Sequence, residues 1–288
     1  MPPLLFGVSV STSAAPDADP AGQARAAEEL GFDFVSASDH PSGTHPTYET
    51  WTMLTWIAAA TSRITIASRV LSLPFRSPAL VAKMAESLNR FAGNRLILGL
   101  GAGAADAELR GFGLPVPTAR DKVDGLAEAV EIIRGVWRQP AFSYAGRVHT
   151  VAGAELEPKP PRPIPIWLGT FGDRALAVTG RHADGWIPSL GYAGADRLAQ
   201  MRGQVLAAAR AAGRPPGDVT CALHLEVSVG GGADAGPDIV SGSPGQIAGR
   251  LSELVEAGFT AFSFSPAGPR PASEQVEQLA ADVIPQLR

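Results

Sequence analysis

Short apolar segments typical of buried strands alternate with helix-like segments along the whole chain of 288 residues. The clearest example is residues 64–103, where a strand, a helix and a second strand follow one another and the last strand ends in glycines. Eight such strand–helix pairs can be counted, and an eightfold repeat of this kind closes naturally into a (β/α)8, or TIM, barrel. The same pattern leaves open a doubly wound sheet of eight strands. We expect the barrel, with residues 1–288 forming one domain.

The alternation sets approximate limits for each element. The expected strands are residues 4–11, 32–39, 64–71, 95–100, 166–169, 185–189, 219–229 and 259–265. The expected helices are residues 20–30, 49–61, 78–91, 121–138, 173–182, 195–212, 246–257 and 274–287. A short hairpin that turns at Ala145 and Gly146 is expected as an insertion before the fifth strand. The glycine-rich segment 230–244 is expected to be a flexible loop.

Charge and composition exclude several classes of partner and site. The 24 basic and 28 acidic residues are scattered and give a net charge of −4, without the basic stripe typical of nucleic-acid or anionic-membrane binding. The chain has no run of 18 apolar residues and no charged leader at its start, so we expect a cytoplasmic protein. Cys221 is the single cysteine and is interpreted as a packing residue. The five histidines lack paired ligand spacing, so no metal site is expected.

The side-chain pattern of the seventh strand indicates what the inside of the barrel looks like. Cys221, Leu223, Leu225, Val227 and Val229 share one strand face, which we expect to pack outward against the helices. The opposite face, with His224, Glu226 and Ser228, would then point into the lumen. A polar upper lumen predicts a ligand cavity at the carboxyl ends of the strands, where active sites of such barrels lie.

Asp39 and His40 follow the second strand directly. At a strand end of a barrel, an Asp-His pair can orient a substrate, stabilise a developing charge or move a proton. The competing interpretation is that Asp39 caps a turn and His40 is an ordinary loop residue. The expected position at the carboxyl end of a barrel strand favours a functional pair.

Arg69 stands in an otherwise apolar strand, so its charge needs solvent, a partner or a ligand. Glu226 is one conceivable partner, and a structural ion pair between the two is slightly favoured over a direct catalytic role. Arg76, at the entry to the next helix, is expected at the surface or on the rim.

Two glycine clusters end predicted strands. Gly101-Ala102-Gly103 leaves bare backbone that a ligand can approach, although three strand–helix units precede it and a Rossmann nucleotide site is therefore weakly supported. The second cluster joins the fifth strand to its helix and comprises Gly169, Thr170, Phe171, Gly172, Asp173 and Arg174. Backbone N–H groups at such a helix start bind phosphate, with the Thr170 hydroxyl and Arg174 as possible helpers. An ordinary strand-to-helix turn remains the alternative.

In its motifs the chain resembles the bacterial luciferase-like oxidoreductases that depend on flavin or on the deazaflavin coenzyme F420. The similarity covers nearly the whole chain, through FDFVSASDHP, the stretch 48–103, the Glu108…GFG segment, residues 157–189 and SPGQIAGRLSELVEAGF. Singly these motifs are weak, whereas their order and spacing are specific for the family. The resemblance implies a TIM barrel that holds a flavin-like ring at its mouth.

The same resemblance implies roles for particular residues. A bulge at Ser68-Arg69-Val70, often with a non-prolyl cis peptide in relatives, would back the central ring of the cofactor. Gly101, Ala102 and Gly103 would line the ring and ribityl region, and residues 169–174 would hold the phosphate end. Asp39 and His40 match the strand-two motif of the deazaflavin-dependent members. Relatives are often dimers, so a homodimer is possible.

One departure concerns the substrate. Sugar-phosphate dehydrogenases of this family carry an acidic residue just after the fourth-strand glycines, where this chain has Ala104, and no lysines stand where they could clamp a sugar phosphate. The expected function is hydride transfer between coenzyme F420 and a small organic substrate other than glucose 6-phosphate. The alternatives are an FMN-dependent monooxygenase of the same family and a non-catalytic deazaflavin-binding barrel.

Overall fold

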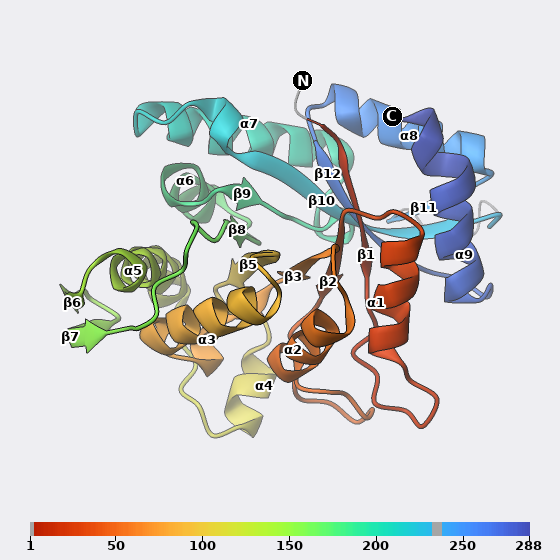
Figure 1. The fold of residues 1–288 in the computed structure, drawn as a ribbon. Helices are drawn as coiled ribbons and strands as arrows, with labels where there is room; N and C mark the ends of the chain where they lie inside the picture. Colours follow the sequence, from red (N-terminus) through yellow and green to blue (C-terminus); the bar gives the residue numbers. More distant parts are fainter. Residues whose placement is uncertain (1–2, 232–237) are drawn as a thin grey trace.

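The computed structural model describes residues 3–231 and 238–288. Within this part of the chain, eight strands pair in parallel around a closed ring with the helices outside it (Figure 1). The ring strands are β1 (Leu5–Ser9), β2 (Phe34–Ala37), β3 (Thr65–Ser68), β5 (Leu96–Gly101), β8 (Ile166–Leu168), β9 (Gly185–Trp186), β10 (Thr220–Val229) and β12 (Ala261–Pro266). β10 pairs with both β9 and β12, which closes the ring and excludes the open sheet. The predicted (β/α)8 barrel is therefore confirmed.

The helices begin where the sequence supplies capping groups. Ser77 caps α3 with Pro78 at its first position, and Ser243 and Gln246 form a capping box at the start of α8. The outer helices are α1 (Pro20–Glu29), α2 (Thr50–Ala60), α3 (Pro78–Phe91), α5 (Ala119–Arg138), α6 (Asp173–His182), α7 (Ala195–Ala211), α8 (Pro244–Glu256) and α9 (Ala272–Gln278). None of the helices in the two described ranges has the length and apolar character needed to cross a membrane.

Several short elements depart from the pattern expected from the sequence. The short strands β4 (Leu71–Ser72) and β11 (Ile239–Gly242) extend the sheet beside β5 and β10. The expectation of a loop throughout 230–244 is therefore wrong for β11, while residues 232–237 of that segment lie outside the described residues. A short helix, α4 (Asp106–Gly111), follows β5. The last predicted helix changes after Gln278 into a π-helical turn over 279–283 and a 3₁₀ turn over 284–286.

The predicted hairpin before the fifth barrel strand is confirmed as β6 (Ala141–Ala145) and β7 (Thr150–Glu155). Glu128 of α5 fixes its turn, because its carboxylate accepts hydrogen bonds from the backbone N–H groups of Arg147, Val148 and His149. The insertion is thereby tied to α5, on the outside of the barrel.

The lower lumen is filled and the upper lumen is open. The outward faces of β1 and β10 are apolar and buried as expected, and Cys221 packs there as a buried thiol. A separate apolar cluster fills the inside of the barrel: Phe34, Ala67, Ile97, Trp167, Ile187, Ala222 and Ala261. A ligand can therefore enter the barrel at the carboxyl ends of the strands.

Glu28 of α1 connects this helix to the segment that leads into β3. Partial burial opposes ionisation of its carboxyl, but hydrogen bonds from the backbone N–H groups of Arg63, Ile64 and Ser62 prevail and lower its pKa from 4.5 to about 2. A depressed folded-state pKa adds stability above pH 4.5, and this contribution disappears as the pH falls towards about 2.

We expect Glu28→Gln to lower the free energy of unfolding by about 2 kcal/mol at pH 7, and by much less at about pH 2, because the contribution of the ionised carboxylate falls as the pH drops from 4.5 to its folded-state pKa of about 2. Urea unfolding of both proteins at the two pH values measures the difference. Glu29→Gln, at the exposed neighbouring position, serves as the control. An equal loss at both pH values would contradict the assignment.

Candidate active site

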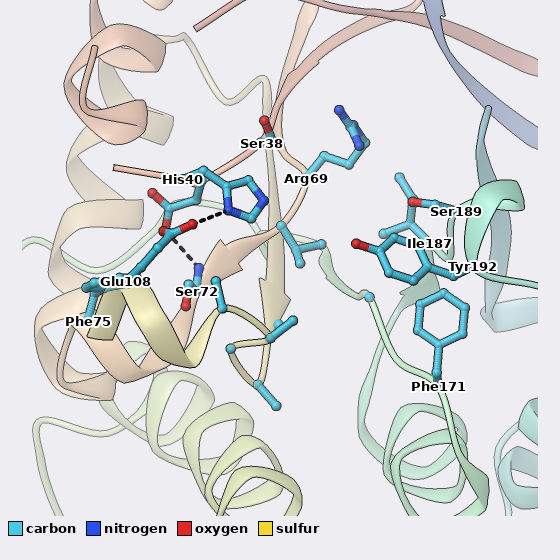
Figure 2. A pocket seen from close by; sticks show the side chains of 18 residues that line it. Ser38, His40, Arg69, Ser72, Phe75, Glu108, Phe171, Ile187, Ser189 and Tyr192 are labelled. Carbon is cyan, nitrogen blue, oxygen red and sulfur yellow. Dashed lines mark hydrogen bonds and ion pairs between the residues drawn. The ribbon is translucent and has the colours of Figure 1, made fainter. Parts of the chain in front are cut away.

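A cavity of about 280 Å³ opens at the carboxyl ends of the strands (Figure 2). Segments that follow β2, β3, β5, β8 and β9 contribute to its wall. Of the residues singled out from the sequence, the cavity brings together Asp39, His40, Arg69, Val70, Gly101, Ala102, Gly103, Gly169 and Phe171. Ser68, Thr170, Gly172 and Arg174 are not part of this wall. The sequence analysis thus predicts the correct end of the barrel and many of the residues that line this cavity.

The floor of the cavity is the expected bulge after β3. The peptide bond between Arg69 and Val70 is cis, and pairing with β5 resumes in β4. The Ser68 hydroxyl donates to the carbonyl oxygen of Gly99 at 2.8 Å and accepts from its N–H at 3.0 Å, which locks the bulge to β5. Ser68 therefore supports the cavity from behind.

The glycines beside the bulge make room for it. A Cβ atom on Gly99 would lie 1.9 Å from the carbonyl oxygen of Ser68. On Gly101 it would lie 2.6 Å from a methyl carbon of Val70, and on Gly169 3.0 Å from one. These positions exclude side chains because Val70 and the bulge backbone already occupy the space. As a consequence the cavity wall beside Val70 is bare backbone.

Asp39 forms a buried ion pair. Its side chain is fully buried, and it accepts from Arg76 Nη1 at 2.7 Å, from Arg76 Nη2 at 3.3 Å and from the backbone N–H of Ser72 at 2.9 Å. Arg76 also donates to Glu49 at 2.6 Å. Burial opposes the charge on Arg76, but the hydrogen bonds from Arg76 to Asp39 prevail and raise the pKa of Arg76. Arg76 was expected at the surface or on the rim. The surface position is wrong, because Asp39 draws the side chain inward until it is 11% exposed.

His40 pairs with a carboxylate that sequence reasoning did not select as a site residue. His40 Nδ1 lies 2.8 Å from Glu108 Oε1, and Glu108 comes from the short helix α4. An ionised carboxylate only accepts hydrogen bonds, so Nδ1 carries the hydrogen. The second ring nitrogen, Nε2, then faces the cavity (Figure 2). Glu108 Oε2 is buried and has no hydrogen-bond partner among the described residues.

Arg69 does not form the ion pair expected with Glu226. Within the described ranges no carboxylate lies within 4.0 Å of its guanidinium. It donates instead to two hydroxyls, Ser9 Oγ at 3.0 Å from Nη2 and Ser36 Oγ at 3.3 Å from Nε. Burial lowers the pKa of Arg69 to about 10, against the opposing fields of Glu226 and Tyr192. The side chain is still a cation at neutral pH, and the expected structural ion pair is a wrong prediction.

The second glycine cluster is only partly available to a ligand. The Thr170 hydroxyl lies 2.7 Å from that of Thr179, behind the cavity, and Arg174 forms an exposed ion pair with Asp124 at 2.6 Å. Gly172, with φ of 81°, precedes α6, whose first N–H groups receive no side-chain cap. What this cluster offers a phosphate is therefore mainly the backbone at the start of α6.

The mouth of the cavity carries two aromatic rings on the side opposite His40 (Figure 2). The ring centroids of Phe171 and Tyr192 lie 5.4 Å apart, and Tyr192 is 76% exposed. Within the described residues, no group of three or more His, Cys, Asp or Glu side chains is placed to hold a metal ion. The site thus combines an apolar and backbone-lined cradle with one histidine–carboxylate pair and one arginine.

A closed (β/α)8 barrel with such a cavity at the carboxyl ends of its strands is typical of barrel enzymes that bind an organic ligand. The profile of the luciferase-like monooxygenase family matches residues 4–238. The chain belongs to this family, and it is an oxidoreductase by that membership.

Named relatives and solved structures agree with this family. The chain is 28% identical to an F420-dependent glucose-6-phosphate dehydrogenase of Kineococcus radiotolerans, over 99% of this chain and 98% of that enzyme. It is 32% identical to the enzyme of the same name from Microbacterium testaceum, over 66% of this chain and 57% of that enzyme.

Two solved structures share the fold. An F420-dependent secondary alcohol dehydrogenase, in complex with an F420–acetone adduct, superposes with a TM-score of 0.89 at 20% identity, over 99% of both chains. The F420-dependent tetrahydromethanopterin reductase of Methanopyrus kandleri superposes with a TM-score of 0.82 at 21% identity, over 99% of this chain and 100% of that one. At these identities the likeness establishes the barrel architecture.

Proposed function

We propose that this protein transfers a hydride between coenzyme F420 and a small organic substrate at the barrel mouth. The observation that carries the proposal is the cavity itself, with the Arg69–Val70 bulge as its floor and the His40–Glu108 pair on its wall. A relative that matches 99% of this chain is named as an F420-dependent glucose-6-phosphate dehydrogenase, which supports the choice of cofactor.

The residues present fit a flat, extended cofactor. Gly101 and Gly169 carry no side chains, because a Cβ atom at either position would lie too close to Val70. A ring system can therefore lie against their backbone and the Val70 side chain. The backbone of 101–103 and the start of α6 would hold the rest of the cofactor. When bound, the coenzyme supplies or accepts the hydride, and the protein supplies orientation and electrostatics.

The proposed proton-handling residue is His40. Its Nδ1 hydrogen is held by Glu108, so Nε2 can accept a proton from the substrate when the substrate loses a hydride, and return one when it gains a hydride. Asp39 was predicted as a catalytic partner of His40, and that role stays untested. In this geometry we assign Asp39 a positioning role, because its carboxylate is engaged by Arg76 and by the N–H of Ser72 in β4.

We also propose that the substrate is not glucose 6-phosphate, although relatives carry that name. Ala104 lines the cavity where the resemblance leads us to expect an acidic residue, and no lysine lines this cavity. A sugar phosphate would therefore lack both an acid at this position and a lysine clamp for its dianion.

Cofactor titration tests the proposal directly. We expect F420 to bind saturably with one molecule per chain and to change its absorbance or fluorescence, with FMN binding at least tenfold more weakly. Equilibrium titration of the purified protein with each cofactor measures this. Tight binding of FMN without binding of F420 would instead support an FMN-dependent monooxygenase. F420 binding without turnover of any substrate would support a deazaflavin-binding protein.

A further inference from the structure

Arg69 differs from Arg76, the other partly buried arginine near this site. Arg76 is neutralised by two carboxylates, those of Asp39 and Glu49. Among the residues that the structure describes, the guanidinium of Arg69 has the neutral hydroxyls of Ser9 and Ser36 as its hydrogen-bond partners. Its Nη1 has no hydrogen-bond partner in residues 3–231 and 238–288, and the side chain lines the cavity. One edge of a partly buried cation is thus left for a ligand that enters the cavity.

If Arg69 had only a structural role, this arrangement would lower the stability of the fold. A buried charge without an ionic partner costs free energy that a neutral side chain of similar length would not cost. Glu226 acts on Arg69 only through space, since the two form no ion pair within 4.0 Å. The two serine hydroxyls hold Nε and Nη2 in place, which presents the remaining edge in a defined orientation. This is the geometry of a preorganised anion receptor.

The rest of the cavity defines which anion fits. The wall near Tyr192 is apolar or aromatic, with Val70, Phe171 and Ile187, and no lysine lines it. A single guanidinium edge matches a planar monoanion, whereas a phosphate dianion is usually held by several cations or by N–H groups of a helix start. Arg69 extends away from His40 and Glu108 in Figure 2, so the two groups can contact different parts of one substrate.

We propose that Arg69 is a substrate-binding residue and that the substrates of this site are organic carboxylates with a small apolar body, bound with the carboxylate on Arg69. The inference rests on the proposed function for the reaction, but the carboxylate site can be tested without turnover. The carbon that exchanges the hydride would lie towards His40, on the other side of the bound molecule. The Arg69 backbone remains part of the proposed cofactor floor.

The test compares carboxylates with their neutral amides. Acetate and benzoate, each against its primary amide, are titrated by calorimetry into the F420-loaded protein, with inorganic phosphate as a third probe. We expect at least one carboxylate to bind about tenfold or more tightly than its amide and more tightly than phosphate. Arg69→Gln should abolish that preference, and Arg69→Lys should retain part of it because it keeps the charge but loses the planar fork. Arg197→Gln, which removes an exposed arginine of α7, should leave it intact.

The possible outcomes separate the two proposals. If the protein binds F420 but shows no preference for carboxylates, or if Arg69→Gln retains the preference, the carboxylate site is wrong and the proposed function stands. If F420 does not bind, the same titrations on the isolated protein still test Arg69. Thermal unfolding of each variant identifies any that fail to fold, and the Lys variant then provides the comparison. Phosphate binding more tightly than both carboxylates would also overturn the inference.

Discussion

Replacement of His40 by alanine is expected to lower kcat of F420-dependent turnover by about 100- to 10,000-fold, the usual contribution of a positioned acid or base. The physical reason is that His40 Nε2 is the ring nitrogen that faces the cavity, while Nδ1 is held by Glu108 at 2.8 Å. The cofactor dissociation constant should change by less than about threefold, because His40 belongs to the wall and the bulge forms the floor. Steady-state kinetics together with cofactor titration separate the two effects.

Two further variants distinguish a reacting group from a supporting one. Glu108→Gln keeps an oxygen that can accept from Nδ1, so we expect a smaller loss of kcat, about tenfold, with little change in KM. His45→Ala removes an exposed histidine a few residues away that does not line the cavity, and kcat should stay at the wild-type value. A His40→Ala protein with unchanged kcat would remove the proposed proton-handling role.

The barrel was predictable because its signals are local. Each signal depends on a few neighbouring residues: alternating apolar residues in strands, an apolar stripe on helices, and caps such as Ser77-Pro78. Their repetition along the chain strengthens the prediction of the barrel. The errors fall where tertiary context decides. β11 is only four residues between glycine-rich neighbours and exists because β10 extends far enough to pair with it. The end of the last helix differs in its cause, because Pro285 has no backbone N–H and cannot continue an α-helix, and the chain leaves the α-helical geometry after Gln278.

The position of the candidate site could be predicted from the sequence, but the hydrogen-bond partners of its residues could not. Asp39 and His40 were located because they end a strand, yet their partners lie 37 and 68 residues further along the chain. No sequence pattern ties His40 to Glu108, because α4 is a six-residue helix whose placement depends on the loop after β5. The Glu108…GFG segment marked the region without assigning the carboxylate a role.

The sequence analysis selected Gly101 correctly, but for only part of the physical reason. Gly101 was selected because bare backbone admits a ligand, and it does line the cavity. Its Cβ is nonetheless excluded first by Val70, a residue 31 positions earlier on the bulge. The close approach of two chain segments is therefore the physical cause, and ligand access follows from it.

Loss of the buried arginine beside Asp39 is expected to have the largest effect on stability. Arg76→Met leaves the fully buried Asp39 carboxylate with the Ser72 N–H as its remaining partner, and breaking a buried pair in this way costs about 3 to 5 kcal/mol of unfolding free energy. Urea unfolding at neutral pH measures the change. Arg250→Met removes an exposed arginine that pairs with Glu253 and should cost less than about 1 kcal/mol.

A second substitution shows whether the cost comes from the stranded charge or from lost packing. Adding Asp39→Asn to Arg76→Met removes the uncompensated carboxylate while keeping an oxygen that can accept from Ser72 N–H, so most of the lost stability should return. No recovery in the double variant would mean that the methylene stem of Arg76 matters more than its charge. Recovery would establish that Asp39 requires its cation, which ties the end of β2 to the segment after β4 and thereby holds His40 at the edge of the cavity.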